Sequence, residues 1–200
     1  DLLAAVPSII FGMWGIQFLT PQLTGFNEWL TTTLGWIPIF RNDVGIYSRS
    51  VLNAGIVLAI MVLPTVSAIS REVLVQVPKG TMEAALALGA TRWEMLRMAV
   101  FPFARPGMVS ASMLGLGRAL GETIAVALML SATYTINPHI TEPGGITFAA
   151  NIALRWAESG PIGISALVAS GLVLFVITLA VNGTARGVIA RHAEFAGSHS

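Results

Sequence analysis

The segment of residues 107–131 is almost wholly apolar, yet it carries two charged residues, Arg118 and Glu122, near its middle. Its length exceeds the roughly 20 residues that a helix needs to cross the hydrocarbon core of a bilayer. An ionised side chain at that depth costs about 2.5–3.5 kcal/mol or more, so it persists where it faces protein or water. The i, i+4 spacing predicts that both side chains share one helix face. They are therefore either a neutralised pair between packed helices or part of a path for a charged solute.

The composition is typical of a membrane protein and excludes several other classes. Hydrophobic residues make up 54% of the 200 positions and charged residues 10%, against about 25% charged in soluble domains. The net charge of +1, without a basic run interleaved with aromatic residues, gives no indication of nucleic-acid binding. Cysteine is absent, which excludes disulfides and thiolate metal sites, and the three histidines show no metal-ligand spacing, so no metal site is predicted.

Four apolar segments predict an all-α, polytopic membrane protein with about four spans. The segments are residues 2–19, 46–70, 107–131 and 162–181. The chain begins with Asp1, without an initiator methionine or a signal-peptide pattern. We therefore expect residues 1–200 to form a single transmembrane domain that lacks some N-terminal spans.

The basic residues predict which connections face the cytoplasm, where arginine and lysine concentrate in membrane proteins. Those that follow the second and fourth apolar segments are Arg71, Lys79, Arg92, Arg97, Arg105, Arg186 and Arg191. We therefore expect residues 71–106 and the C-terminus to be cytoplasmic, and the connections 20–45 and 132–161 to be external. Within the second external connection, apolar residues recur every four positions over residues 148–156. This pattern predicts either an interfacial or re-entrant helix or a plain surface helix.

Two short helices around a glycine turn are predicted within residues 71–106. Thr81 is the expected N-cap of the first helix, and Gly89 ends it in the left-handed conformation that glycine adopts without strain. Thr91 and Glu94 fit the S/T-x-x-E capping box of the second helix. An apolar helix pair of this kind is suited to docking into a partner's groove. A hairpin that lies against its own spans has the same pattern.

A signature within this cytoplasmic segment resembles that of ABC-importer permease subunits. The residues that match its EAA motif are Glu83, Ala84, Ala85, Gly89 and, thirteen residues later, Pro102. The resemblance implies a type I importer fold and a coupling-helix loop over residues 71–106, which inserts into a cleft on a separate ATPase subunit. Pro102 is also expected to end the second short helix.

Two further segments are similar to the permeases of phosphate importers in particular. They read GLGRALGETIAVAL at residues 115–128 and LLAAVPSIIFGMWG at residues 2–15. The fit is closer to the PstC type of subunit than to the PstA type, and the resemblance extends over most of residues 2–185. It implies a multi-pass permease in the inner or plasma membrane of a prokaryote, where it forms the phosphate translocation pathway.

The same resemblance implies the partners of such a permease. These are a second permease subunit of the PstA type, a dimer of ATPase subunits of the PstB type and an extracytoplasmic phosphate-binding protein of the PstS type. The chain holds no Walker A sequence, GxxxxGK[ST]. We therefore expect ATP and Mg²⁺ to bind the ATPase partner, and we expect this chain to carry neither a cofactor nor an enzymatic activity.

The residues expected to serve the pathway lie in the third apolar segment. Arg118 is the candidate anion ligand, because it is the only basic residue deep in a predicted span and a guanidinium binds phosphate oxygens bidentately. Glu122 either holds Arg118 while the pathway is empty or accepts a hydrogen bond from the protonated phosphate oxygen. Thr123 offers a hydroxyl donor. Gly117 and Gly121 form a GxxxG motif that lets two membrane helices approach closely, within this chain or against the second permease subunit.

Three other functions are the alternatives to phosphate import. An importer for another oxyanion, such as sulfate or molybdate, needs the same kinds of residue. An ion channel needs no cytoplasmic docking helices. The pair of short helices predicted within residues 71–106 therefore argues against a channel. An intramembrane protease needs a histidine or paired aspartates at bilayer depth, and no histidine or aspartate lies within a predicted span.

Overall fold

The computed structural model describes residues 6–197, including the side chains of residues 6–187, and this part of the chain is helical without a β-strand. The helices are α1 (Ser8–Trp14), α2 (Thr20–Leu34), α3 (Val51–Val75), α4 (Lys79–Ala87), α5 (Arg92–Met95), α6 (Phe101–Leu120), α7 (Ile124–Met129), α8 (Phe148–Arg155) and α9 (Pro161–Gly197). Short π segments, Gly15–Leu19 and Leu96–Val100, join α1 to α2 and α5 to α6 without a break. The expected all-α fold is confirmed. Residues 2–5 of the first expected segment, the side chain of Arg191 and the C-terminal end lie outside the described residues.

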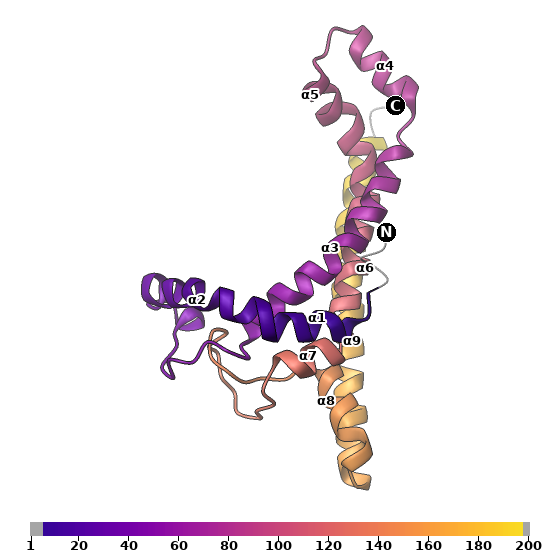
Figure 1. Cartoon of the computed structure of the whole chain (residues 1–200). Coiled ribbons are helices and arrows are strands. Elements are labelled where there is room, and N and C mark those ends of the chain that lie inside the picture. Colours follow the sequence, from indigo (N-terminus) through magenta and orange to yellow (C-terminus); the bar gives the residue numbers. More distant parts are fainter. Residues whose placement is uncertain (1–5, 198–200) are drawn as a thin grey trace.

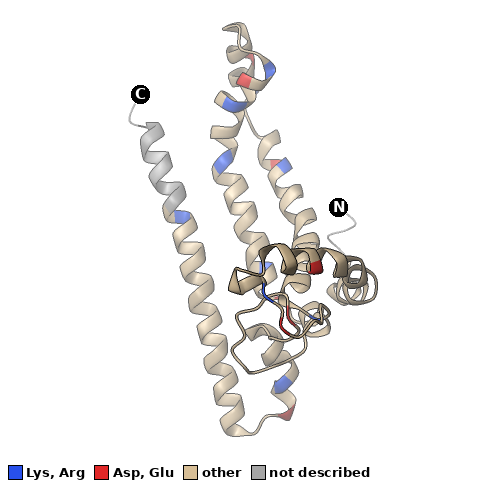
Figure 2. Ribbon diagram, turned by 90° about the vertical axis from the view of Figure 1, so that its left-hand side faces the viewer, with Lys and Arg blue, Asp and Glu red and all other residues tan. Residues whose placement is uncertain are grey.

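Helices α6 and α9 run in opposite directions beside one another, and α3 packs along α6 (Figure 1). The α4–α5 hairpin lies at one end of this bundle, and α8 packs on α9 toward the other end. The helix expected over residues 148–156 is therefore present as α8. Figure 2 shows that charged residues gather at the hairpin and in the loops, whereas the described side chains of α9 include a single charged residue, Arg186.

Two of the helices are long and apolar enough to cross a bilayer. They are α3 and the part Pro161–Gly187 of α9, with mean hydropathies of 2.1 and 2.6. They correspond to the second and fourth expected segments. The first expected segment forms α1 and then continues as helix to Leu34, well beyond its expected end at residue 19. The third expected segment, residues 107–131, was predicted to be one helix, and this is wrong. A break at residues 121–123 divides the segment between α6 and α7.

The start of α3 is set by a buried polar cluster. The Ser50 hydroxyl accepts a hydrogen bond from the backbone N–H of Asn53 at 3.3 Å, which makes Ser50 the N-cap. The Asn53 side chain accepts a hydrogen bond from Asn27 of α2 at 2.9 Å and donates one to the backbone oxygen of Tyr47 at 2.8 Å. The fully buried Asn27 and Asn53 thus tie α2 to the apolar helix α3.

Small residues allow α6 to pack closely against α3. Ala104 and Ala111 of α6 are completely buried. A Cβ added at Gly107 would lie 2.5 Å from Cγ1 of Val73, and one added at Gly115 would lie 2.5 Å from Cγ2 of Val66. Because real side chains do not approach so closely, the contact requires glycine at both positions. The small residues of α6 therefore form the face that meets α3.

This face is not the one that the GxxxG motif predicts. A Cβ at Gly117 would meet nothing within 4 Å, and one at Gly121 would meet only backbone atoms of Gly117 and Arg118. Within the described chain, close helix packing therefore uses the face of Gly107 and Gly115. The sequence carried the necessary signal, since Gly107, Ala111 and Gly115 recur every four residues. An interface between Gly117 or Gly121 and a second subunit stays a prediction.

Replacing Gly115 with leucine is expected to destabilise the helix pair, because the new side chain would overlap Val62 and Val66. Overpacking of this kind costs about 1–3 kcal/mol. Gly55→Leu is the matched control, since a Cβ at this exposed position of α3 meets nothing within 4 Å. Thermal unfolding in detergent, followed by tryptophan fluorescence, should show a lower midpoint for Gly115→Leu alone. Equal midpoints for both variants would contradict the packing argument.

Candidate functional site

Arg118 and Glu122 lie on either side of a helix break rather than on one helix face. Arg118 is in the last turn of α6, whose C-cap is Gly121. Glu122 follows the break, and its Oε1 accepts a hydrogen bond from the backbone N–H of Ala125 in α7 at 3.2 Å. The ion pairs of the described residues do not include an Arg118–Glu122 pair. The expectation of a shared helix face is therefore wrong, because it assumed that the helix continues through Gly121.

Each of the two charges complements the helix end beside it. The carbonyl groups at the C-terminal end of a helix carry partial negative charge, and the N–H groups at the N-terminal end carry partial positive charge. Arg118 is the basic residue in the last turn of α6, and Glu122 accepts from the first turn of α7. Such interactions contribute about 0.3–1 kcal/mol each at exposed sites. Two separate helix-end interactions thus take the place of the neutralised pair.

A cavity of about 580 Å³ lies between α3, α6 and α9, and Arg118 lines it. The lining residues are Thr65, Ser110, Met113, Leu114, Gly117, Arg118, Asn182, Ala185 and Arg186. None of them is acidic, and neither Glu122 nor Thr123 is among them. The volume lies within the roughly 300–1,000 Å³ of small-ligand sites. Of the three expected pathway residues, Arg118 alone therefore reaches this cavity.

The polar groups around the cavity differ in whether they have hydrogen-bond partners. The Ser110 hydroxyl donates to the backbone oxygen of Pro106 at 3.0 Å. The Thr65 hydroxyl oxygen is buried and has no hydrogen-bond partner among the described residues. Sequence reasoning missed Thr65, Asn182 and Arg186 as site residues. They belong to helices far from Arg118 in the chain, and no motif links them to it.

The glycine turn and the capping box of the α4–α5 hairpin are both confirmed. Gly89 has a φ of +86°, the left-handed conformation expected after α4. The backbone N–H of Thr91 donates to Glu94 Oε2 at 2.8 Å, and the Glu94 N–H donates to the Thr91 hydroxyl at 3.3 Å. The hydrogen bonds from the Thr91 N–H and hydroxyl lower the pKa of Glu94. The local sequence thus determines both sides of the turn.

The expected start of the first hairpin helix is wrong. Helix α4 begins at Lys79 with Pro78 as its N-cap, and Thr81 lies inside the helix without a capping bond. Proline is well suited to a helix start because its φ is already helical and its missing N–H is not needed there. Pro78 therefore begins the helix before Thr81 is reached.

The expected end of the second hairpin helix at Pro102 is also wrong. The chain stays helical from α5 through the π segment into α6, and Pro102 lies in the first turn of α6. The backbone N–H of Phe101 donates to the oxygen of Leu96, five residues earlier. A proline breaks a regular helix because it lacks an N–H and crowds the preceding turn. The wider π turn provides room for that crowding, so the helix continues.

The hairpin is anchored at its base and exposed at its tip. Val77, Val100 and Ala104 are buried together where α3 ends and α6 begins. Beyond this cluster the hairpin projects past the helix bundle (Figure 1). The residues of the EAA signature, Glu83, Ala84, Ala85, Gly89 and Pro102, are exposed except for the half-buried Ala85. Large apolar side chains are exposed nearby, among them Leu88 at 90%, Met98 at 73% and Trp93 at 65%. The hairpin therefore does not lie along its own spans.

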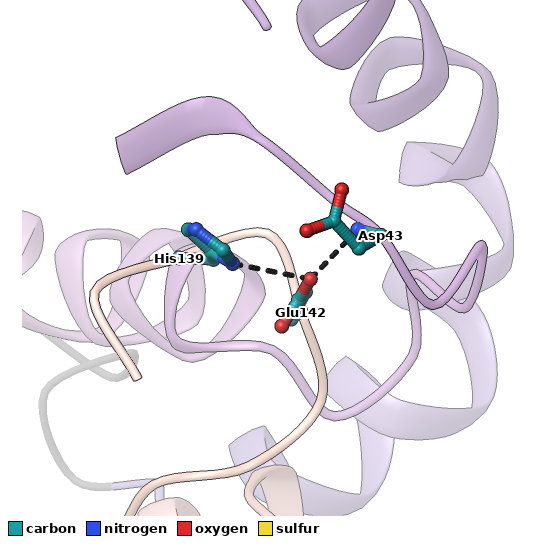
Figure 3. A group of neighbouring side chains, drawn as sticks. All are labelled: Asp43, His139 and Glu142. Carbon is teal, nitrogen blue, oxygen red and sulfur yellow. Dashed lines mark hydrogen bonds and ion pairs between the residues drawn. The ribbon is translucent and has the colours of Figure 1, made fainter. Parts of the chain in front are cut away.

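A second polar cluster joins two loops that are about 100 residues apart in the chain (Figure 3). The Glu142 side chain is almost completely buried. Its Oε1 accepts hydrogen bonds from the backbone N–H of Asp43 at 2.7 Å and from His139 Nδ1 at 3.2 Å. Its Oε2 accepts one from the Asn137 side chain at 2.6 Å. We call Asp43, Asn137, His139 and Glu142 the loop clip. Sequence reasoning missed it, because only the fold brings the two loops together.

The loop clip also bears on the expectation that the chain holds no metal site. Ligand atoms of Asp43, His139 and Glu142 lie within 4.8 Å of one another, a grouping that could accept a cation. Both Glu142 oxygens already accept hydrogen bonds from protein donors, and the Asp43 carboxylate pairs with Arg41 at 2.7 Å. The cluster is therefore satisfied by protein groups alone.

Glu142→Gln is expected to destabilise the two joined loops by about 1–3 kcal/mol, the cost of leaving a buried polar partner unsatisfied. Burial raises the pKa of Glu142, but the hydrogen bonds from Asp43, Asn137 and His139 outweigh it and lower the pKa below its ordinary 4.5. The stabilisation by the carboxylate is therefore complete above pH 4.5 and is lost as the pH falls further. Unfolding midpoints measured across this range should fall with acid in the parent protein and fall less in Glu142→Gln.

The exposed Glu158 provides the matched control for this measurement. Glu158→Gln removes an exposed carboxylate that follows α8 without touching the loop clip. Its unfolding midpoints should follow those of the parent protein at every pH. A parent-like pH profile in Glu142→Gln would contradict the assigned role of the buried carboxylate.

Comparison with known proteins reveals a match along most of the chain. A family model described as "Binding-protein-dependent transport system inner membrane component" matches residues 1–191. The chain is 49% identical over 191 residues to the phosphate transport system permease protein PstC 2 of Mycobacterium tuberculosis. It is 46% identical over 191 residues to PstC of Mycobacterium leprae and 42% identical over 197 residues to PstC of Xylella fastidiosa. No solved structure matches the chain.

These alignments cover 94%, 94% and 96% of this chain and 59%, 60% and 60% of the three relatives. The chain therefore spans about three-fifths of the length of the curated relatives that it matches. The family match, the all-helical fold and the two apolar helices α3 and α9 agree with one another. The chain belongs to the family of inner membrane components of binding-protein-dependent transport systems, and its described part is α-helical.

Proposed function

We propose that this chain forms part of the translocation pathway in the PstC-type permease subunit of an ATP-driven phosphate importer. The observation that carries the proposal is the cavity lined by Arg118, which has basic, hydroxyl and amide groups but no carboxylate. An anion leaves water only where cations and hydrogen-bond donors replace its hydration. The curated relatives are named phosphate transport system permease proteins, which supports phosphate as the anion.

The helix break gives the three expected pathway residues different roles in this proposal. Arg118 binds the passing anion, because its guanidinium offers a planar fork of donors and stays charged. Glu122 stabilises the break by accepting the Ala125 N–H, so that Arg118 is held at the end of α6. Thr123 is the N-cap of α7, and its hydroxyl makes no capping hydrogen bond, which leaves it available to the anion beyond the break.

The hairpin carries the proposed contact with the ATPase. Its apolar side chains Leu88, Trp93 and Met98 are exposed around and after the capped turn, an arrangement suited to helix-in-groove docking. The partners are an ATPase dimer of the PstB type at the hairpin, a second permease subunit of the PstA type and an extracytoplasmic binding protein of the PstS type. ATP and Mg²⁺ bind the ATPase, and this chain itself carries no cofactor.

Import of another oxyanion is the second candidate function. Sulfate and molybdate would meet the same guanidinium, hydroxyl and amide groups in the cavity. The deciding experiment reconstitutes the complete complex in proteoliposomes and measures ATP-dependent uptake of labelled phosphate, with unlabelled sulfate and molybdate as competitors. We expect uptake to be inhibited by unlabelled phosphate and not by sulfate or molybdate. Uptake abolished equally by sulfate or molybdate would reassign the substrate, and ion flux without ATP would indicate a channel.

Cysteines placed singly at Lys79 and Ile136 are expected to be labelled from opposite sides of the membrane. Both positions are exposed, and the chain has no cysteine of its own. The basic residues around the hairpin predict that Lys79 is cytoplasmic and that Ile136, in the loop before α8, is external. The extent of labelling by a membrane-impermeant maleimide is measured on intact cells and on inside-out vesicles. Labelling of both cysteines from one side would overturn the proposed topology and the ATPase contact.

A further inference from the structure

The cavity between α3, α6 and α9 contains a second guanidinium. Arg186 lines it from α9, together with Asn182 one turn earlier. The i, i+4 spacing sets these two side chains on one face of α9. Helices α6 and α9 lie beside one another and run in opposite directions (Figure 1). Arg118 lines the cavity from α6, and Arg186 lines it from α9.

The charges that line this cavity are unbalanced. Two of its lining residues are arginines and none is acidic. Among the side chains that the structure describes, the ion pairs are Arg41–Asp43 and His139–Glu142, and neither involves a cavity arginine. Two like charges that face one cavity repel each other, and the repulsion grows as the surroundings become less polar than water. An anion between them removes this repulsion and accepts charge-assisted hydrogen bonds from both.

Thr65 gives an independent indication that a ligand oxygen belongs here. Thr65 lines the same cavity from α3, and its hydroxyl oxygen is buried and lacks a hydrogen-bond partner in the described part of the chain. Thr178 of α9, by contrast, donates its hydroxyl to the backbone oxygen of Leu174 at 2.7 Å. An unsatisfied buried hydroxyl costs about 1–3 kcal/mol. An oxyanion that approaches Thr65 from the cavity, and to which its side chain turns, would accept this hydrogen bond.

We infer that Arg186, with Arg118 and Thr65, forms a two-guanidinium site for a tetrahedral oxyanion between α3, α6 and α9. The inference rests on the proposed function and deepens it, because it adds α9 to the anion pathway. Since the ligands come from three helices, the site is complete only while α9 stays beside α6. Separation of these helices would leave the anion with one guanidinium and release it. The phosphate of an anionic lipid has the same chemistry, and the experiment must distinguish it from the free anion.

The test measures the electrostatic potential in the cavity with a cysteine in place of Ala185, in the complete complex freed of its other cysteines. A negatively charged and a positively charged thiosulfonate reagent modify this cysteine at rates that depend on the local potential. Arg186→Gln is expected to lower the ratio of the anionic to the cationic rate about tenfold. Arg105→Gln, on α6 but outside the cavity lining, should leave the ratio unchanged. Inorganic phosphate should slow modification in the parent and not in Arg186→Gln.

The possible outcomes separate this site from the proposed function. A rate ratio unchanged by Arg186→Gln, or phosphate protection that persists in that variant, overturns the two-guanidinium site and leaves the role of Arg118 intact. Failure of the proposed function would be seen in the uptake assay instead, as the absence of ATP-dependent phosphate uptake by the parent complex. The assay is run in phosphatidylcholine liposomes with and without phosphatidylglycerol. Protection by phosphatidylglycerol but not by inorganic phosphate would assign the site to a lipid headgroup and overturn the free-anion site.

Discussion

Arg118→Gln is expected to lower ATP-dependent phosphate uptake about 10- to 150-fold in proteoliposomes that hold the complete complex. Glutamine keeps a hydrogen-bond donor but removes the charge-assisted contact, which is worth about 1.5–3 kcal/mol, and 1.4 kcal/mol corresponds to a factor of ten. Arg118 has no carboxylate partner among the described residues, so the substitution leaves no charge unpaired behind it. Initial rates of labelled phosphate uptake, divided by the amount of assembled complex, provide the measurement.

Substitutions at Glu122 separate a ligand role of Arg118 from a structural one. Glu122→Gln keeps an oxygen that can accept the Ala125 N–H, so its effect on uptake should be milder than that of Arg118→Gln. Glu122→Ala removes the acceptor and should weaken the start of α7 by about 0.5–2 kcal/mol. If transport returned when Arg118→Gln and Glu122→Gln were combined, the two residues would only neutralise each other. The phosphate-ligand role of Arg118 would then have to be abandoned.

Gly89→Leu is expected to uncouple uptake from ATP hydrolysis while the protein still assembles in the membrane. At a φ of +86° a residue with a Cβ loses about 1–2 kcal/mol, which changes a conformational equilibrium about 5- to 30-fold. The turn between α4 and α5 should therefore deform and move Leu88 and Trp93 away from their present positions. Phosphate uptake should fall by a similar factor, and the ATPase rate should no longer rise with external substrate.

Two variants control for the added side-chain volume and for the backbone conformation at Gly89. Gly80→Leu adds the same side chain to α4 at an exposed position where a Cβ meets nothing within 4 Å, and it should leave coupling intact. Gly89→Asn should retain most of the activity, because asparagine tolerates the left-handed conformation better than other residues with a Cβ. Normal uptake by Gly89→Leu would show that the hairpin turn does not carry the coupling.

Features that depend on neighbouring residues were predicted well from the sequence. The capping box of Thr91 and Glu94, the left-handed Gly89 and the apolar helices α3 and α9 each follow from a short stretch of chain. Their physical causes, a side chain that reaches its own backbone or a long run without charge, act locally. A single sequence contains all the information that such features need.

The errors arose where two local tendencies compete or where distant segments meet. Residues 107–131 have the composition of one span, but Gly121 favours ending the helix and Glu122 can cap a new one. Pro102 was expected to end a helix, and a π turn before it prevents this. The cavity depends on the meeting of Thr65, Arg118 and Arg186 from three helices, which no pattern within one segment encodes.

The loop clip has a consequence for how the chain is inserted during its synthesis. Its hydrogen bond from the Asp43 N–H to Glu142 joins residues 99 positions apart, with α3, the hairpin, α6 and α7 between them. Both loops must therefore have left the ribosome and reached the same compartment before Glu142 meets the backbone N–H of Asp43. A chain with one intervening helix threaded the wrong way would keep the two loops apart and leave this carboxylate without its donor from Asp43. The clip thus favours the correctly threaded chain over its misthreaded forms during biogenesis.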